Sequence, residues 1–187
     1  MSNLRFGPER AEMEEEIFSL YRRAAQKGSL DGTSLWDEDY PGREALREDL
    51  AGGNVFSLRE GGRLLAVISV GEEEAEVSDC GVPWTAGRPW VLSRLCVEPQ
   101  RQGRGLAGIL MQRIIAKARE EGRTSLQILA APANPAANRL YTGLGCLRLG
   151  LVRLFGQEFF AYEYPLSPQG PAFPAKGETV AKSGEEC

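Results

Sequence analysis

The stretch that most constrains the fold covers residues 97–108 and reads Val-Glu-Pro-Gln-Arg-Gln-Gly-Arg-Gly-Leu-Ala-Gly. It contains the end of an apolar strand, a glycine-rich basic turn and the start of a helix. A helix N-terminus offers free N–H groups and the positive end of the helix dipole, and glycine lets the backbone close around an anion. We therefore expect a strand–turn–helix unit that binds a phosphate-bearing ligand.

Hydrophobic periodicity divides the rest of the chain into helices and strands. The pattern predicts helices over residues 9–27, 42–50, 103–121 and 135–144, with Gly28 ending the first. It predicts strands over residues 54–59, 63–70, 90–97, 125–130, 147–154 and 158–164. We expect residues 1–166 to form one domain and residues 167–187, rich in proline, glycine and charge, to form a flexible tail.

Composition excludes several classes of partner and of chemistry. The 187-residue chain has a net charge of −4 and a pI near 5.1, which argues against nucleic acid as the main partner. It contains no apolar run of the roughly 20 residues that span a membrane and no signal-peptide core, so we expect a cytoplasmic protein. The absence of histidine removes Ser–His and Cys–His nucleophiles, and the scattered cysteines predict buried or incidental thiols and no metal site.

The glycine-rich turn matches the dinucleotide fingerprint G-x-G-x-x-G over residues 103–108. In that motif the first glycine directly follows the strand, and an acid about 20 residues later holds the ribose. Here five residues separate Val97 from Gly103, and the next strand ends in Leu129-Ala-Ala-Pro without an acid. No Gly-Lys-Ser/Thr follows the glycines, so the turn is not a nucleotide P-loop either.

Two other motifs lie in and after this turn. The first is Gln100-x-x-Gly103-x-Gly105, of the form Q/R-x-x-G-x-G/A; the second is Asn134-x-x-Ala137-x-x-x-Tyr141-x-x-x-Gly145, followed by Cys146 in place of the usual aromatic. With both motifs in this order, residues 9–166 resemble the GNAT superfamily of acetyl-CoA-dependent N-acetyltransferases. The resemblance implies an α/β (α+β) fold in which a mixed, mostly antiparallel central sheet is flanked by helices and a splayed strand pair holds CoA.

The resemblance also assigns residues to acetyl-CoA. The backbone of Leu95, Cys96 and Val97 would pair with the pantetheine arm like an added strand. The amides of the turn would wrap the pyrophosphate, namely those of Gln102, Gly103, Arg104, Gly105, Leu106 and Ala107. Arg101 and Arg104 would supply positive charge, or would form an ordinary solvated basic turn.

Two asparagines of the second motif are further candidates for the cofactor site. Asn134 would hold the pantetheine arm, cap the following helix, or do both. Asn138, on the exposed side of that helix, would meet the adenine or 3′-phosphate end of the cofactor.

Catalysis requires an acid and a base. Tyr141 is the candidate acid, because a phenol can protonate the departing CoA thiolate, although a half-buried aromatic that packs its helix would look the same. The strand over residues 90–97 holds no carboxylate. Glu98 at its end is therefore the first candidate base, with Asp79 and the acidic run 72–76 as alternatives, and the run also suits a solvated strand end.

The loop over residues 34–41 gives the clue to the acceptor. Trp36, Asp37, Asp39 and Tyr40 combine aromatic and acidic groups, which suits a cationic amine through cation–π contact and Coulomb attraction. The same residues also suit a turn with one core-anchoring tryptophan and exposed acids.

The sequence thus predicts an enzyme that moves an acetyl group from acetyl-CoA to a primary amine, either a small cationic amine or a lysine-like acceptor, by direct attack. A protein N-terminal or lysine acetyltransferase is one alternative, and a weakly active CoA-binding sensor module is another. Acetyl-CoA and the amine are the expected partners, and a homodimer is left open.

Overall fold

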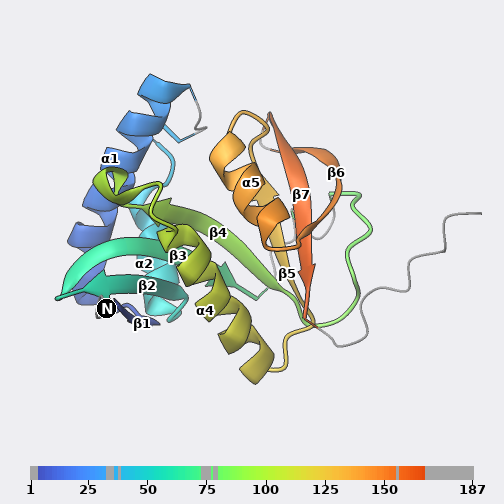
Figure 1. Cartoon of the computed structure of the whole chain (residues 1–187), viewed down its shortest axis with the longest axis horizontal. Coiled ribbons are helices and arrows are strands. Elements are labelled where there is room, and N and C mark those ends of the chain that lie inside the picture. The colour runs from blue at the N-terminus through green and yellow to red at the C-terminus, as the bar shows by residue number, and fades with distance from the viewer. Residues whose placement is uncertain are drawn as a thin grey trace, which may run out of the picture.

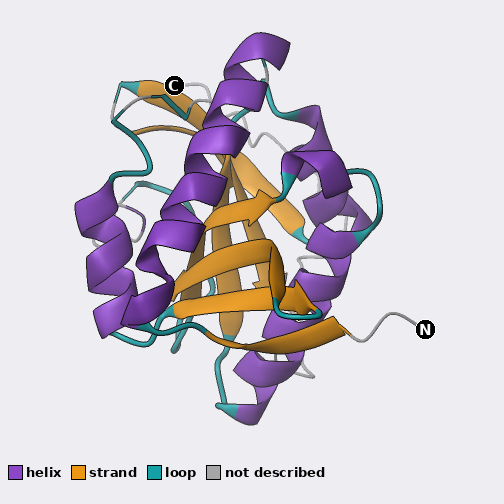
Figure 2. Cartoon of the chain, turned by 90° about the vertical axis from the view of Figure 1, so that its left-hand side faces the viewer, coloured by secondary structure: helices purple, strands orange, loops and turns teal. Residues whose placement is uncertain are grey.

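The computed structural model describes residues 4–32, 36–37, 39–72, 77, 80–154 and 156–166. These residues form a seven-stranded sheet of order β1-β2-β3-β4-β5-β7-β6, with helices on both faces (Figures 1 and 2). All neighbouring strands are antiparallel except β4 and β5, which are parallel. The predicted mixed, mostly antiparallel sheet is confirmed.

The strands are β1 Leu4–Pro8, β2 Val55–Glu60, β3 Arg63–Gly71, β4 Trp90–Val97, β5 Ser125–Ala130, β6 Leu147–Leu154 and β7 Gln157–Pro165. The α-helices are α1 Glu14–Asp31, α2 Arg43–Ala51, α4 Leu106–Glu120 and α5 Pro135–Gly143, and the short 3-10 helices are η1 Ala11–Met13 and η2 Pro99–Arg101. None of these helices combines the length and the apolar character needed to cross a membrane.

The structure corrects three boundaries. Strand β1 is absent from the predicted elements because its five residues include a glycine and a proline and show no alternation; pairing with β2 stabilises it. Helix α1 continues through the buried Gly28 and ends at Gly32, which has a left-handed φ of 63°. Helix α4 begins at Leu106 and not at Gly103, because the preceding glycines leave the helical conformation. The predicted tail, residues 167–187, lies outside the described residues.

Each face of the sheet has its own core. The larger core lies between the sheet and helices α4 and α5, and includes Leu110, Ile114 and Tyr141. The second core lies under α1 and α2, with Ile17 and Leu46 packed against Val67 of β3 and Cys96 of β4. Since side chains alternate along a strand, the neighbours of Val67, Ala66 and Ile68, belong to the larger core.

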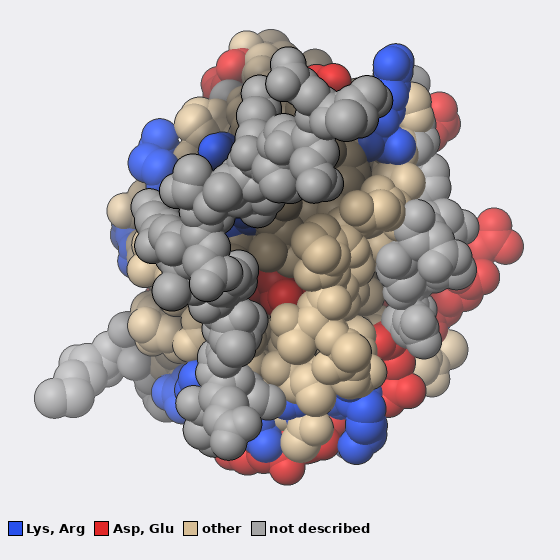
Figure 3. All heavy atoms as spheres, turned by 90° about the vertical axis from the view of Figure 1, so that its right-hand side faces the viewer, with Lys and Arg blue, Asp and Glu red and all other residues tan. Residues whose placement is uncertain are grey.

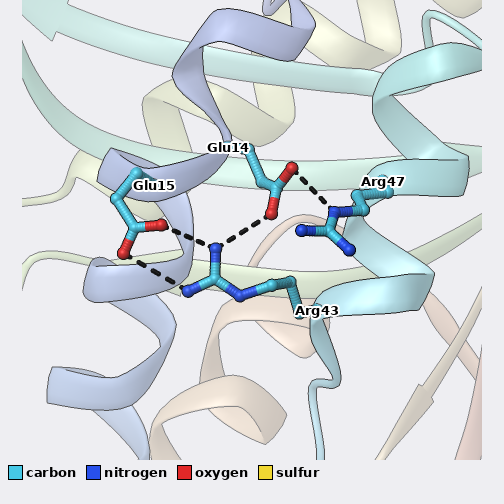
Figure 4. A network of polar contacts seen from close by, with 4 residues as sticks. All are labelled: Glu14, Glu15, Arg43 and Arg47. Carbon is cyan, nitrogen blue, oxygen red and sulfur yellow. Dashed lines mark hydrogen bonds and ion pairs between the residues drawn. The ribbon is translucent and has the colours of Figure 1, made fainter.

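Ion pairs fix α1 against α2 (Figure 4). Arg43 of α2 donates to Glu14 at 2.9 Å and to Glu15 at 2.6 Å, and Arg47 donates to Glu14 at 2.9 Å. The arginines hold the pKa values of both carboxyls below their usual range. These groups are largely solvated, so the network orients the helix pair more than it stabilises the fold.

Candidate functional site

The central feature of the site is a gap in the sheet between the two parallel strands. β4 and β5 pair only over Trp90–Leu126, Val91–Gln127 and Leu92–Ile128. Beyond these pairs β4 continues along β3 to Val97, while β5 continues along β7 to Ala130. The β5-facing edge of β4 after Leu92 therefore pairs with no strand in the described part of the chain. This is the splayed strand pair expected from the sequence.

The open edge of β4 offers its backbone to a ligand while its side chains pack inward. Leu95 and Val97 pack on the larger core, and Cys96 is buried in the second core. Burial raises the pKa of the Cys96 thiol well above its ordinary value. The thiol therefore stays protonated and is a poor nucleophile.

A β-bulge interrupts β4 where the gap opens. Arg94 has a φ of 54°, unusual for a non-glycine residue, and the β3–β4 register shifts beside it. Its guanidinium donates to Asp49 of α2 at 2.6 and 3.0 Å, and Ser69 donates to the same carboxylate at 2.6 Å. The sequence analysis missed this cluster, because its members come from three separate elements and share no local motif.

The glycine-rich turn lies at the other end of β4. Gly103 and Gly105 have φ values of 74° and 76°, and a Cβ atom on either would meet open space. The backbone conformation, and not crowding, therefore requires glycine at both positions. Gln102 donates to the carbonyl of Val97 at 3.4 Å and holds the turn to the strand.

This turn has the features needed to bind a pyrophosphate. Gly105 is the N-cap of α4 and provides no side-chain cap, so the first N–H groups of the helix have no partner within the helix. Arg104 is exposed beside them, Leu106 is buried and fixes the helix start, and Ala107 is half-buried. The residues present therefore fit the phosphate end of acetyl-CoA, as the turn sequence predicts.

The two asparagines of the second motif hold their own turn. Asn134 caps α5 by accepting a hydrogen bond from the Ala137 N–H at 3.0 Å. Asn138 does not lie on the exposed side of α5 as expected. Its amide donates to the carbonyls of Ala131 and Asn134 at 3.0 and 2.8 Å, and it accepts from the Tyr162 hydroxyl at 3.1 Å. Any effect of Asn138 on CoA therefore acts through the shape of the β5–α5 turn.

Tyr141 lies on α5, buried against Tyr162, with ring centroids 5.6 Å apart. Burial raises the pKa of its phenol above the ordinary value, so the hydroxyl keeps its proton at neutral pH. A general acid must hold a proton to donate, and Tyr141 meets that condition. Its catalytic role stays a prediction.

Glu98 forms a structural contact. It is 5 % exposed, and its carboxylate accepts a hydrogen bond from Arg23 of α1 at 2.7 Å. The pair ties α1 to the end of β4, so a base at this position would have to act while bound to a cation. Of the alternative bases, Asp79 and residues 73–76 lie outside the described residues, and Glu72 pairs with Arg123 at 2.5 Å.

The acceptor loop shows features of both interpretations drawn from its sequence. Trp36 packs edge-on against Tyr21 of α1 at 5.5 Å and against Tyr40 at 6.3 Å, so it anchors the loop. Asp37 accepts hydrogen bonds from the N–H groups of Asp39 and Tyr40 at 2.8 Å, and these bonds lower the pKa of its carboxyl. Tyr40, 44 % exposed, and the exposed Asp39 remain open to a ligand.

Comparison with solved structures gives the same architecture. A GNAT-family acetyltransferase from Streptococcus agalactiae has a TM-score of 0.78 at 23 % identity, covering 88 % of this chain and 97 % of that one. The protein yncA from Salmonella typhimurium, solved with its cofactor acetyl-CoA, has a TM-score of 0.67 at 18 % identity, covering 90 % of this chain and 97 % of that one. An agmatine N-acetyltransferase has a TM-score of 0.67 at 15 % identity, covering 88 % of this chain and 100 % of that one.

Comparison with curated protein sequences gives no significant match. The family model described as "Acetyltransferase (GNAT) family" matches residues 14–146, which include the splayed strands, the glycine-rich turn and the whole second motif. The chain belongs to the GNAT family of acetyl-CoA-dependent acyltransferases.

Proposed function

We propose that this acetyltransferase acts on a primary amine that is cationic at neutral pH, either a small amine or a lysine-like side chain. The observation that carries the proposal is the acceptor loop, in which the exposed ring of Tyr40 lies against the anchored Trp36 and the neighbouring Asp39 is exposed. Aromatic faces and carboxylates together attract ammonium groups. The name of one structural neighbour, agmatine N-acetyltransferase, also specifies a cationic amine.

The proposed roles along the cofactor path follow from the exposed backbone. The open edge of β4 at Leu95–Val97 pairs with the pantetheine arm, and the turn at Gly103–Gly105 binds the pyrophosphate through N–H groups at the start of α4. Bound acetyl-CoA supplies an acetyl thioester that an amine can attack. Tyr141 donates a proton to the departing sulfur.

Two measurements test the proposal. Isothermal titration should show that acetyl-CoA binds and that NADH does not. CoA release should then be followed with agmatine, n-butylamine, N-acetyl-lysine amide and a peptide with a free N-terminus. We expect turnover of agmatine, n-butylamine and N-acetyl-lysine amide and little turnover of the peptide.

Tyr40→Ala isolates the contribution of the loop. We expect it to raise the KM of the best amine about fivefold through loss of cation–π contact, with the affinity for acetyl-CoA unchanged. Tyr164→Ala is the matched control, since Tyr164 lies on β7, contacts the larger core and is paired with Arg119. Binding of acetyl-CoA without turnover of any amine would favour the sensor alternative.

A further inference from the structure

Glu163 of β7 is a buried carboxylate that has no cation partner in the described part of the chain. It is 2 % exposed, and its one hydrogen-bond donor among the described residues is Thr85, whose backbone N lies 3.1 and 3.2 Å from the two oxygens and whose hydroxyl lies 2.8 Å from one of them. No lysine or arginine of the described residues forms an ion pair with it. A carboxylate accepts about four hydrogen bonds, so Glu163 keeps unused capacity in a place where an unpaired charge is costly.

Gln127 of β5 supplies a second unsatisfied group next to it. Gln127 and Glu163 are direct partners in the β5–β7 ladder, and Gln127 is 3 % exposed. Its Oε1 atom is fully buried and accepts no hydrogen bond. Two neighbouring buried acceptors with too few donors form a site suited to a ligand that brings N–H groups and positive charge.

Strand alternation places both side chains on the face of the sheet opposite α4 and α5. Their neighbours in sequence, Tyr162 on β7 and Leu126 and Ile128 on β5, belong to the larger core. Gln127 and Glu163 therefore point to the other face, which α1, α2 and Trp36 cover further along the sheet.

The register places the pair next to the gap. Val91, Gln127 and Glu163 lie side by side on β4, β5 and β7, one step before the last β4–β5 pair, Leu92–Ile128. The end of the molecule that carries β6 and β7 shows an uncharged area, with acidic atoms visible next to it at the middle of the face and lysines and arginines towards the edges (Figure 3). A carboxylate here lies at the start of the splay, on the face that carries the acceptor loop.

We propose that Glu163 and the Gln127 amide oxygen receive the ammonium group of the acceptor, and that Glu163 removes its proton. This assignment rests on the proposed function and narrows the substrate class. Around the pair the strands carry aliphatic side chains on the same face, namely those of Val91, Leu129, Leu147 and Ala161. The acceptor is therefore a primary amine on an aliphatic chain.

The proton balance follows from these roles. The ammonium gives one proton to Glu163, and the freed lone pair forms the N–C bond to the thioester carbonyl as the C–S bond breaks. The sulfur takes the Tyr141 proton. The nitrogen loses its second proton, which restores Tyr141 through solvent, and Glu163 releases its proton to solvent.

The pH dependence tests this assignment because few charges adjoin the site. On the elements around Glu163 the described charged side chains are Arg94 of β4, Arg148 and Arg153 of β6, Glu158 of β7 and Arg88, and none pairs with Glu163. Arg148 stacks over Phe160, a residue of the larger core. A pH profile of the wild type and a Glu163 variant therefore reports on Glu163 and on the amine.

The experiment uses Glu163→Gln in the full-length chain with n-butylamine and N-acetyl-lysine amide. We expect kcat/KM for the amine to fall about 100-fold near pH 7, which is typical of a lost general base, with the Kd of acetyl-CoA unchanged by titration. The deficit should shrink by about tenfold per pH unit towards about pH 9.5, because free amine then becomes available without a base. Glu158→Gln, an exposed glutamate of the same strand, should match the wild type.

Two outcomes overturn the assignment. One is a Glu163→Gln protein as active as the wild type near neutral pH; the other is a pH-independent loss accompanied by weaker acetyl-CoA binding, which indicates a structural role. Should Glu163→Gln not fold, Gln127→Met provides the test. It should raise the KM of the amine about tenfold with acetyl-CoA affinity kept, and an unchanged KM overturns the assignment. A wild type that turns over no amine refutes the proposed function instead.

Discussion

Tyr141 and Cys96 show how burial has opposite consequences for two reactive groups. Burial raises the pKa values of the phenol and of the thiol. The phenol keeps the proton that an acid needs, whereas the thiol loses the nucleophilic form that a covalent mechanism needs. Burial therefore disfavours Cys96 as a nucleophile and is compatible with the proposed role of Tyr141 as the acid.

Tyr141→Phe tests this role at the residue scale. We expect kcat to fall about 10–100-fold while the Kd of acetyl-CoA stays the same, since the change removes only the donated proton. Tyr162→Phe is the matched control, because it removes the bond to Asn138 and lowers the free energy of unfolding by about 1 kcal/mol while keeping the ring beside Tyr141 and the Tyr141 hydroxyl itself. Wild-type kcat in Tyr141→Phe would exclude the phenol as the acid.

Among the secondary-structure elements, β4 carries most of the functional geometry. It pairs with β3 along its length, parts from β5 after Leu92, and contains the bulge at Arg94. A non-glycine residue in a left-handed conformation costs about 1–3 kcal/mol. The contacts of Arg94 with Asp49 and Ser69 offset this cost and join β4 to β3 and α2.

Asp49→Asn should therefore destabilise the fold markedly. It leaves the Arg94 guanidinium without its counter-charge at a site where the arginine side chain is 12 % exposed, and we expect a loss of about 3 kcal/mol in urea unfolding. Asp31→Asn removes a solvated pair with Lys27 and should change the free energy of unfolding by less than about 0.5 kcal/mol. Equal effects of the two changes would show that the Arg94 pair does not support the bulge.

The elements also show what a sequence can and cannot predict. The bounds of β4, β5 and β6 agree with the predicted strands because apolar runs and turn residues mark them locally. The glycine-rich turn can also be predicted from local sequence, because the positive φ values of Gly103 and Gly105 favour glycine at both positions. β1 could not be predicted, since it depends on a partner about 50 residues away in the chain.

The candidate site was predictable to the same extent. The sequence predicted the glycine-rich turn before α4 and the position of Tyr141 on a short helix, but it could not show that Arg23 pairs with Glu98 or that Asn138 turns inward. Glu163 was overlooked because it lies within an aromatic strand that serves the core. An acid at an alternating position of such a strand is the signal that could have revealed it.

At the scale of the whole molecule, two cores on opposite faces of one sheet determine the response to alkali. The larger core contains Tyr141 and Cys146, and the second contains Tyr21 and Cys96. Burial raises the pKa values of all four groups, that of Cys146 to about 12. The neutral form of each group is therefore favoured in the folded protein relative to the unfolded chain.

The free energy of unfolding should therefore fall as the pH becomes alkaline. A raised folded-state pKa contributes stability that is fully present below the unfolded pKa, about 8.5 for cysteine and about 10 for tyrosine, and is lost as the pH rises towards the folded value. We expect the free energy of unfolding from urea titrations to decline from about pH 8.5 upwards. In the Cys96→Ala protein this free energy should decline less steeply with pH. A constant free energy up to about pH 10.5 would contradict the prediction.

The gap between β4 and β5 has one more consequence. Only three residue pairs join the two strands, so the sheet is weakest where the cosubstrate is expected to complete it. A ligand that pairs with the open edge of β4 is therefore expected to stabilise the sheet as well as to react. Release of the product then removes this stabilisation, so the stability of the sheet is expected to fall and rise once in each turnover.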